Sequence, residues 1–384
     1  MARLGDVCTI VSGATPKTNC PEFWNGGIKW ITPAELQADS DVVTDTERKI
    51  TQKAVNNCGV TLFPKGTVLL SSRAPIGKVA IAGVEMCCNQ GFKNLICSDA
   101  VYNRYLYWFL KGKNAYLNSL GRGATFKEIS RSIVEDIEIP LPEKTVQHHI
   151  ADVFDEVSKL ILLHRKQLEQ MDNLVKARFV EMFGDLVIGD KISTNKRRIG
   201  DIASVTKLAG FEFTRYIQYK EQGDIIMLRG LNCKKGHLVL NDVKWIDRET
   251  SDLLPRSKLY YGDILMTYAG TIGDVALVDI DDKYHLAPNV AKITLNNKEE
   301  FNPVFLIHLF MYTNDYIMTF ASQVAQASIN MQKIRDFEYF FPSTEQQNEF
   351  ATFVTQVDKS KVVVQKALDE VQTLFDSLMQ QYFG

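Results

Sequence analysis

Three polar segments in the first third of the chain hold side chains of the types that contact nucleic acid. Residues 71–78 form a polar, basic loop after an apolar run, and residues 89–93 place two amide side chains beside a cation. Amides pair with adenine edges and arginine with guanine, so these types suit reading of the major groove. Residues 121–127, with a cation beyond them, suit phosphate contact through cations and free backbone amides. The candidate contacts are Ser71, Ser72, Arg73, Lys78, Asn89, Gln90, Lys93, Arg122, Thr125, Lys127 and Arg131.

A comparable set of polar segments occurs in the second half of the chain. These are residues 267–271, 288–292 and 326–330, and a further polar loop runs from 229 to 236. The candidates here are Arg229, Lys234, Lys235, Tyr268, Thr271, Asn289, Lys292, Gln326, Ser328 and Asn330. Each loop taken singly is at least as well explained as an ordinary solvated connection. Their recurrence at equivalent points of two related segments, with different side chains, favours two readers of two different DNA half-sites.

Motifs for catalysis on DNA are absent from the sequence. Residues 302–305, Asn-Pro-Val-Phe, lack the second proline of the Asn-Pro-Pro-aromatic loop of adenine methyltransferases, and no glycine-rich loop precedes them. A helix start with proline in its first turn accounts for them. There is no Walker lysine motif for ATP, and the exposed pair His148-His149 is of a kind more often solvated than metal-bound. We therefore expect no catalysis, no metal and no cofactor on this chain.

The polar loops belong to two copies of one segment. Residues 3–7 recur at 198–202, 195 positions later, and residues 66–70 and 76–80 recur 196 positions later. Beyond residue 142 the offset is constant at 200, as in Phe183-Gly184 and Phe383-Gly384. The chain is therefore a duplication of a segment of about 184 residues, with insertions in its first part and a last part of constant length.

The last part of each copy predicts a long amphipathic helix. Residues 146–183 contain no proline or glycine, and seam positions recur at steps of three and four with one stutter. Pro142 and Pro342 mark the helix starts, and Ser343 with Gln346 forms a capping box. About 40 residues give a helix of roughly 60 Å, and the shared phase predicts an intramolecular antiparallel pair with a globular half at each end. The predicted seam is 150, 153, 157, 160, 164, 168, 171, 175, 178 and 182, repeated 200 positions later.

The globular halves mix strands and helices without strict alternation. This pattern predicts an α+β fold with curled sheets rather than a doubly wound one. We expect globular domains at 1–142 and 198–342, long helices at 143–184 and 343–384, and a linker at 185–197. Strand-like runs are 67–70, 79–82, 95–97, 264–267 and 275–278, and helices are expected at 103–119 and 303–321.

Composition limits the protein classes that remain. The 384 residues are 45% hydrophobic and 23% charged, which is typical of a globular protein. The net charge of −2 excludes a global basic field, although residues 1–142 carry 16 basic against 13 acidic side chains. There is no apolar run long enough to span a bilayer and no signal-peptide pattern at the start. The seven cysteines show no zinc or redox spacing, which predicts reduced thiols in the cytoplasm.

These residues resemble the specificity subunit of type I restriction–modification systems over essentially the whole chain. The resemblance is carried by the Leu4-Gly5-Asp6 opening, the turns at Gly77 and Gly273, residues 139–142 leading into Gln147, and the ending 178–185. The second copy departs from the pattern at Phe340-Phe341 and at Leu378, where a proline and an arginine are lost.

The resemblance implies two target recognition domains, each binding one half of a split site in double-stranded DNA. The paired helices would then set the half-site spacing and dock two modification subunits that carry S-adenosylmethionine and methylate adenine. Restriction subunits, which use ATP and magnesium, would be further partners. Because the loops differ between the copies, we expect an asymmetric target.

Two other classes of function remain as alternatives. One is a coiled-coil scaffold whose end domains bind proteins, or an antirestriction decoy built on the same fold without a role in methylation. The scaffold predicts salt-insensitive behaviour and no DNA affinity, whereas phosphate-dominated binding weakens steeply with salt. The other is a fused methyltransferase or nuclease, against which the missing motifs count.

Overall fold

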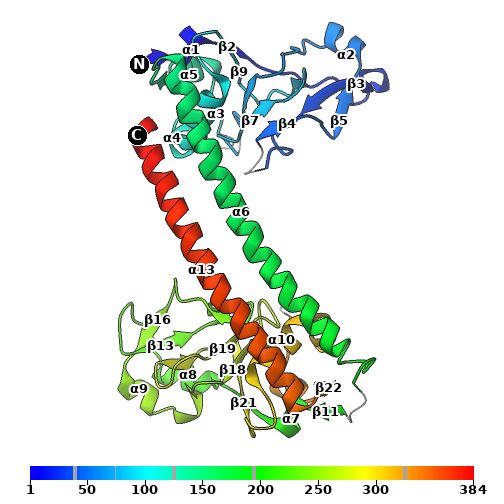
Figure 1. The fold of residues 1–384 in the computed structure, drawn as a ribbon, viewed down its shortest axis with the longest axis vertical. Helices are drawn as coiled ribbons and strands as arrows, with labels where there is room; N and C mark the ends of the chain where they lie inside the picture. Colours follow the sequence, from blue (N-terminus) through cyan, green and yellow to red (C-terminus); the bar gives the residue numbers. More distant parts are fainter. Residues whose placement is uncertain (38–40, 74, 123–126, 193–195, 323–326) are drawn as a thin grey trace. The chain divides into compact units, whose positions relative to one another are not determined.

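The computed structural model describes residues 1–37, 41–73, 75–122, 127–192, 196–322 and 327–384. The chain divides into two compact units (Figure 1). Unit 1 comprises residues 1–165 and 366–384, and unit 2 comprises residues 166–365. Each unit therefore contains one globular half together with a segment from each of the two long helices, α6 (Lys144–Phe183) and α13 (Thr344–Phe383).

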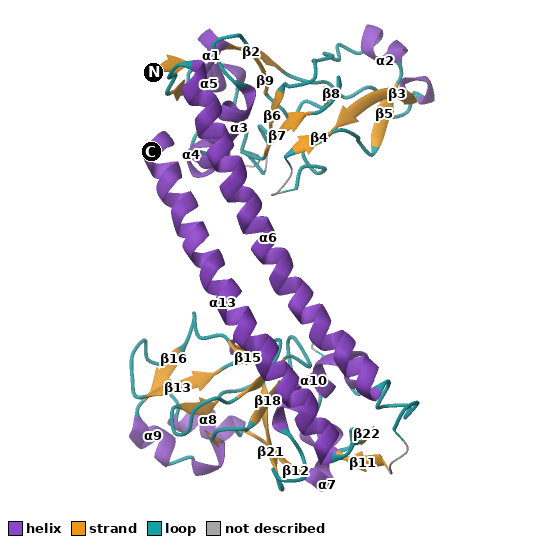
Figure 2. Ribbon diagram, viewed as in Figure 1, coloured by secondary structure: helices purple, strands orange, loops and turns teal. Residues whose placement is uncertain are grey.

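The globular half of unit 1 contains a five-stranded sheet, a three-stranded sheet, a two-stranded sheet and several short helices (Figure 2). The five-stranded sheet has the strand order β2-β9-β6-β7-β4 and the three-stranded sheet has the order β5-β3-β8, while β1 pairs with β10. Its strands are β1 (Ala2–Arg3), β2 (Cys8–Val11), β3 (Trp24–Ile31), β4 (Val42–Val43), β5 (Arg48–Ile50), β6 (Val68–Leu70), β7 (Val79–Ala82), β8 (Cys87–Cys88), β9 (Asn94–Cys97) and β10 (Glu138–Ile139). Its helices are α1 (Leu4–Val7), α2 (Gln52–Asn57), α3 (Asn103–Gly112), α4 (Asn114–Ser119) and α5 (Arg131–Glu135).

The globular half of unit 2 repeats this plan with different insertions. Its sheets have the orders β12-β21-β18-β19 and β16-β13-β20-β17, with β11 paired to β22 and β14 to β15. The strands are β11 (Lys196–Arg198), β12 (Ala203–Lys207), β13 (Ile225–Leu228), β14 (Cys233–Lys234), β15 (His237–Leu238), β16 (Lys244–Ile246), β17 (Lys258–Leu259), β18 (Ile264–Thr267), β19 (Val275–Leu277), β20 (Tyr284–Leu286), β21 (Val290–Leu295) and β22 (Glu338–Phe340). The helices are α7 (Ile199–Ile202), α8 (Gly210–Tyr216), α9 (Arg248–Asp252), α10 (Pro303–Tyr312), α11 (Asn314–Met318) and α12 (Met331–Arg335).

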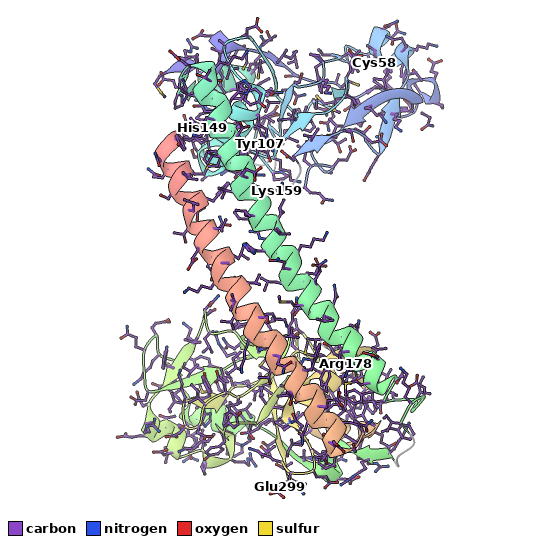
Figure 3. The ribbon with its side chains drawn as sticks, in the orientation of Figure 1. Cys58, Tyr107, His149, Lys159, Arg178 and Glu299 are labelled. Carbon is purple, nitrogen blue, oxygen red and sulfur yellow. The ribbon has the colours of Figure 1, made fainter. Side chains whose placement is uncertain are left out.

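The two long helices pair antiparallel within each unit. In unit 2, Lys361 binds Asp172 at 2.7 Å and Glu349 binds Arg178 at 2.9 Å, so position along α13 falls as position along α6 rises (Figure 3). In unit 1 the Phe154 ring stacks on Phe383 with centroids 5.5 Å apart. The predicted antiparallel pairing and mixed α and β architecture are therefore confirmed.

A buried glutamine attaches each long helix to its own globular half. The Gln147 side chain accepts from the Tyr102 amide at 2.8 Å and donates to the carbonyls of Ala100 and Pro142. Its counterpart Gln347 accepts from the Asn302 amide at 3.0 Å and donates to the Pro342 carbonyl at 3.0 Å. Each glutamine and its partners lie 200 residues from their counterparts, so the attachment is the same in the two copies.

Helix boundaries follow the sequence signals, with two corrections. The capping box forms, since the Ser343 amide donates to the Gln346 side chain and the Gln346 amide donates to the Ser343 hydroxyl. The single helices expected at 103–119 and 303–321 are wrong, because Lys113 and Thr313 leave helical geometry and divide each into two. In unit 1 the break brings Asn114 to the turn at Gly77, whose carbonyl accepts its amide at 2.9 Å.

The predicted seam is wrong at positions 160 and 360, whereas the neighbouring seam positions 157, 164, 168 and 171 are buried or half-buried as expected. Leu160 is 43% exposed, whereas the next residue, Ile161, is 7% exposed. In α13 the seam position Ser360 is likewise exposed. Close to the globular halves, residues outside the predicted seam, such as Phe154 and Phe179, are also buried. There α6 packs both on the other long helix and on a globular half, so it buries a wider stripe than a two-helix seam does.

The linker segment is partly packed. Leu186 and Ile192 are buried in the core of unit 2, and the linker's last residues enter β11. No helix within the described residues is long and apolar enough to cross a membrane.

Candidate nucleic-acid interface

Three polar loops of unit 1 meet at one point. The Ser72 amide donates to the Gly91 carbonyl at 2.8 Å, and the Ile129 amide donates to the Ser72 carbonyl at 3.0 Å. The strand ends β6 and β9 and the start of α5 hold these loops in place. We call the described parts of residues 71–78, 89–93 and 121–131 the junction of unit 1. Residues as far apart in sequence as Ser72 and Ile129 are thus held side by side.

Unit 2 builds the same junction with the same backbone hydrogen bonds. The Tyr268 amide donates to the Asn289 carbonyl at 3.0 Å, and the Ile329 amide donates to the Tyr268 carbonyl at 2.8 Å. We call the described parts of residues 267–274, 288–292 and 321–330 the junction of unit 2. In each copy, three of the loops that the sequence indicated therefore meet, and they do so at equivalent points of the two copies.

The first loop of each junction is a tight turn closed by a hydroxyl group. The Ser71 hydroxyl donates to the Pro75 carbonyl at 2.8 Å and accepts from the Lys78 amide, and the Thr267 hydroxyl donates to the Thr271 carbonyl. Gly77 and Gly273 adopt φ values of 88° and 85°, which a side chain rarely tolerates. Ser71 and Ser72 are buried, so they shape the loop rather than present hydroxyls to a ligand.

An ion triad occupies the junction of unit 1. Arg73 Nε donates to Glu128 Oε2 at 2.9 Å, and Lys93 Nζ lies 3.2 Å from Glu128 Oε1. Partial burial acts to raise the pKa of the Glu128 carboxyl, but the hydrogen bonds from Lys93 and Arg73 outweigh it and lower this pKa from its ordinary value. The sequence pattern did not single out Glu128, because an acid in a basic loop is no signal for DNA contact.

The remaining candidates of unit 1 differ in what their side chains do. Lys78 turns inward and donates to the carbonyls of Pro33 and Leu36, so it holds another loop. The Asn89 side chain accepts from the Gly91 amide at 2.9 Å, and the exposed Gln90 accepts from Thr15.

The cations of the third loop of unit 1 face solvent. Arg122 and Lys127 are exposed and have no side-chain partner within the described residues, while Arg131 pairs with Glu135 at 2.7 Å. The candidate Thr125 lies outside the described residues.

The junction of unit 2 presents mainly uncharged groups. The Tyr268 hydroxyl accepts from the Asn289 amide at 3.3 Å, and Lys207, which sequence reasoning missed, lies 5.5 Å from the Tyr268 ring centre. Thr271 and Asn289 are exposed. Lys292 is buried with its ammonium on the Lys258 carbonyl at 2.9 Å, and burial lowers its pKa.

Two further candidates of unit 2 lie in its third loop. The Ser328 carbonyl accepts from the Ser322 amide at 3.0 Å, and the Ser328 amide donates to the Ser322 hydroxyl at 3.1 Å. The Asn330 side chain caps α12 by accepting from the Lys333 amide at 2.9 Å. The candidate Gln326 lies outside the described residues.

The loop at 229–236 is separate from these backbone contacts. Arg229 donates to the Asp242 carboxylate at 2.7 Å, and Lys234 pairs with Asp274 at 2.5 Å. Lys235 is exposed and adopts a φ of 48°. Of its three cations, two are thus already neutralised by acids.

A concave corner in unit 1 was not anticipated. It is a cavity of about 790 Å³ between the globular half and the helix segments, lined among others by Tyr107 and Lys159 (Figure 3). Arg104 donates to both Asp155 and Asp41, and the Trp108 indole donates to Asp155 at 2.6 Å. The equivalent residues in unit 2 are Val304, Thr355 and His308, of which Val304 and His308 line a smaller cavity of about 400 Å³, so the ion pairs of this corner are specific to the first copy.

Other residues that the sequence offered for catalysis or metal binding have structural contacts instead. Asn302 caps α10 by accepting from the amides of Val304 and Phe305, as expected of a helix start. His148 stacks on Tyr102 with centroids 3.8 Å apart. Among the described residues no group of three or more His, Cys, Asp or Glu side chains could hold a metal ion. Cys87 and Cys88 are free and buried, and burial raises the pKa of each thiol to about 12.

Comparisons with known proteins agree with this geometry. The family model of the type I restriction modification DNA specificity domain matches residues 1–173 and 193–372. The specificity subunit of the type I restriction enzyme MjaIX from Methanocaldococcus jannaschii is 37% identical over 251 residues, which cover 61% of this chain and 58% of that protein. The MjaVIII specificity subunit of the same organism is 23% identical over 396 aligned positions, which cover 99% of this chain and 90% of that protein.

Solved structures share the fold. A chain from a structure describing assembly and conformational transition of a type I R-M system has a TM-score of 0.61 at 15% identity, covering 100% of this chain and 96% of that chain. The S subunit of a type I system from M. genitalium has a TM-score of 0.58 at 16% identity, covering 100% and 95%. The doubled family match agrees with the duplication, and this chain belongs to the family of type I restriction modification DNA specificity domains.

Proposed function

We propose that this chain is the DNA-specificity subunit of a type I restriction–modification complex, with each globular half reading one half of an asymmetric split site. The observation that carries the proposal is the repeated junction. One backbone framework, with the same hydrogen bonds, presents Arg73 and Glu128 in unit 1 and Ala269 and Ser328 in unit 2. A pair of identical frameworks with different side chains is what two readers of different sequences require.

The chain supplies recognition and its partners supply the reaction. The partners in this proposal are double-stranded DNA, two modification subunits carrying S-adenosylmethionine, and restriction subunits using ATP and magnesium. The antiparallel helices would space the half-sites and dock the modification subunits, as dimer geometry sets half-site spacing in other DNA-binding proteins. No finding favours a scaffold or decoy without a role in methylation.

Mapping of DNA methylation tests this proposal. A host without type I systems would carry this gene with its neighbouring methyltransferase gene, and the control would omit only this chain. We expect a split adenine motif with two different halves that is lost in the control. Methylation independent of this chain would contradict the proposed function, and a palindromic motif would contradict the asymmetric target.

Binding in solution gives an independent test. The assembled complex should bind the mapped duplex with an affinity that falls steeply as salt rises, since cation–phosphate contacts release counterions. Salt-insensitive behaviour would favour the protein scaffold.

A further inference from the structure

The backbone on both sides of the Arg73–Glu128 pair is held in place. Glu128 and Arg122 exchange two backbone hydrogen bonds of 3.0 Å each, which closes the described ends of the third loop. Ser72, directly before Arg73, is tied to both other loops. The Arg73 and Glu128 side chains therefore start from backbone positions that hydrogen bonds hold in place.

The Glu128 carboxylate lies between an outer and an inner cation. Its Oε2 atom accepts from Arg73, whose side chain is 47% exposed, and its Oε1 atom faces Lys93, whose side chain is 10% exposed. Lys93 also lies 3.4 Å from the Ser72 hydroxyl. The buried ammonium thus anchors the carboxylate, and the carboxylate orients the exposed guanidinium.

The orientation leaves one end of Arg73 available. Its Nε atom is used by Glu128, while its two terminal nitrogens have no partner within the described residues. Guanine presents two acceptors, O6 and N7, on its major-groove edge, which match two parallel N–H donors. The triad has a net charge of +1, so pairing with Glu128 does not cancel its attraction for DNA.

The triad is not needed to close the junction. In unit 2 Tyr268 makes the same two backbone hydrogen bonds as Ser72, and the bridge between Arg73 and Glu128 is repeated between Ala269 and Ser328. The third loop is closed there by the Ser322 amide and hydroxyl, which bind the Ser328 carbonyl and amide. Ala291 takes the place of Lys93 on the equivalent strand, since it pairs with Met266 as Lys93 pairs with Leu70. The three charged side chains of unit 1 therefore stand at positions where unit 2 forms its junction with uncharged residues.

We propose that Arg73 reads a guanine in the first half-site end-on, and that Glu128, anchored by Lys93, is a positioning residue that sets the pose of Arg73. This inference rests on the proposed function and deepens it by naming a base class and the residues behind its selection. Glu128 acts through Arg73, and Lys93 acts through Glu128, so the three should behave as one unit.

The test uses the complex of the full chain with its modification subunits and duplex libraries randomised in one half-site at a time. Arg73→Ala should lower the preference for guanine at one position of the first half-site by about tenfold or more. Glu128→Gln, which keeps the shape and removes the charge, should lower it several-fold at that same position. Neither variant should change selection in the second half-site.

A double-variant cycle separates positioning from a structural role. Glu128→Gln should have no further effect on selection in the Arg73→Ala background, because there is no guanidinium left to orient. Glu128→Asp should keep part of the preference. Glu22→Gln is the matched control, because Glu22 pairs with Lys53 at 2.7 Å on the surface of the same unit. Glu128→Ser, the residue of the second copy, serves as a second variant if Glu128→Gln does not fold.

The outcomes are distinct. If Arg73→Ala weakens binding equally for all sequences and reduces the salt dependence, Arg73 contacts a phosphate and the inference is overturned. Equal effects of Glu128→Gln with and without Arg73 would also overturn it. If the wild-type complex shows no sequence-dependent binding, the proposed function fails and the inference with it. Wild-type selection that both variants leave unchanged removes only the inference.

Discussion

The junctions of the two units share their backbone and differ in their chemistry. Ser72 and Tyr268 make the same two backbone hydrogen bonds to the neighbouring loops, yet the next residues are Arg73 and Ala269. The side chains that present charge are thus separate from the groups that close the loops. Because the charged side chains take no part in closing the loops, they can change without disturbing the framework, which is what a recognition surface that changes target requires.

The attachment of the long helices shows the opposite behaviour. Gln147 and Gln347 are the same residue, buried to the same extent and bonded to the equivalent backbone groups. Here the side chain itself satisfies buried backbone groups, so a change of side chain breaks the structure. The comparison predicts that substitutions at the attachment destabilise both units, whereas substitutions at the junction alter recognition with little effect on folding.

The largest effect is expected at the attachment. Gln147→Met and Gln347→Met should each destabilise their own unit by about 3 kcal/mol, because buried backbone donors and acceptors lose their partners. Hydrogen exchange resolved by unit would measure this. Similar losses of unfolding free energy in the two units would support the contrast between attachment and junction. A loss below about 1 kcal/mol in either unit would contradict it.

The charged corner of unit 1 should show the next effect. Asp155→Thr, which introduces the residue of the second copy, should cost about 2 kcal/mol because it removes one of the two carboxylates that bind Arg104 and the acceptor of the Trp108 indole. Arg104→Val together with Asp155→Thr should recover at least half of that loss, since unit 2 combines Val304 with Thr355. Denaturant unfolding of the two variants checks this. A double variant less stable than Asp155→Thr alone would contradict the ion-pair explanation.

Acid should weaken unit 2 more than unit 1. Burial lowers the pKa of His285 and of His308, so both take up protons less readily in the folded state than in the unfolded state. Stability should therefore decrease as pH falls below about 6.5, by at most about 1.4 kcal/mol per pH unit for each histidine. Hydrogen exchange between pH 5 and pH 7.5, corrected for intrinsic rates, would test it. Equal losses in both units would exclude this origin.

The smallest effect on stability is expected at the junction. The triple variant Arg73→Ala, Lys93→Ala and Glu128→Ser converts the unit 1 triad to the residues of unit 2. It should change the free energy of unfolding by no more than about 1 kcal/mol, because ion pairs with an exposed member contribute little. Thermal unfolding compared with the Glu22→Gln control measures this. A larger loss would mean that the triad is part of the framework.

The sequence by itself determined the duplication, the strand runs at 68–70, 79–82 and 264–267, and the long helices with their capping signals. These features depend on local preferences and on spacing along the chain, which a sequence displays directly. It also located the loops that meet at the two junctions, because the same segments recur at equivalent positions in both copies.

Only the tertiary structure decided what each polar side chain does. Lys78, Lys93 and Lys292 have the same side chain as the exposed Lys127, but the carbonyls and carboxylate that bind them come from segments far away in sequence. The same holds for the exposure of Leu160 and the burial of Ile161, which depend on how many partners the helix meets at each level. Burial and pairing are properties of several segments at once, so no one segment's composition reveals them.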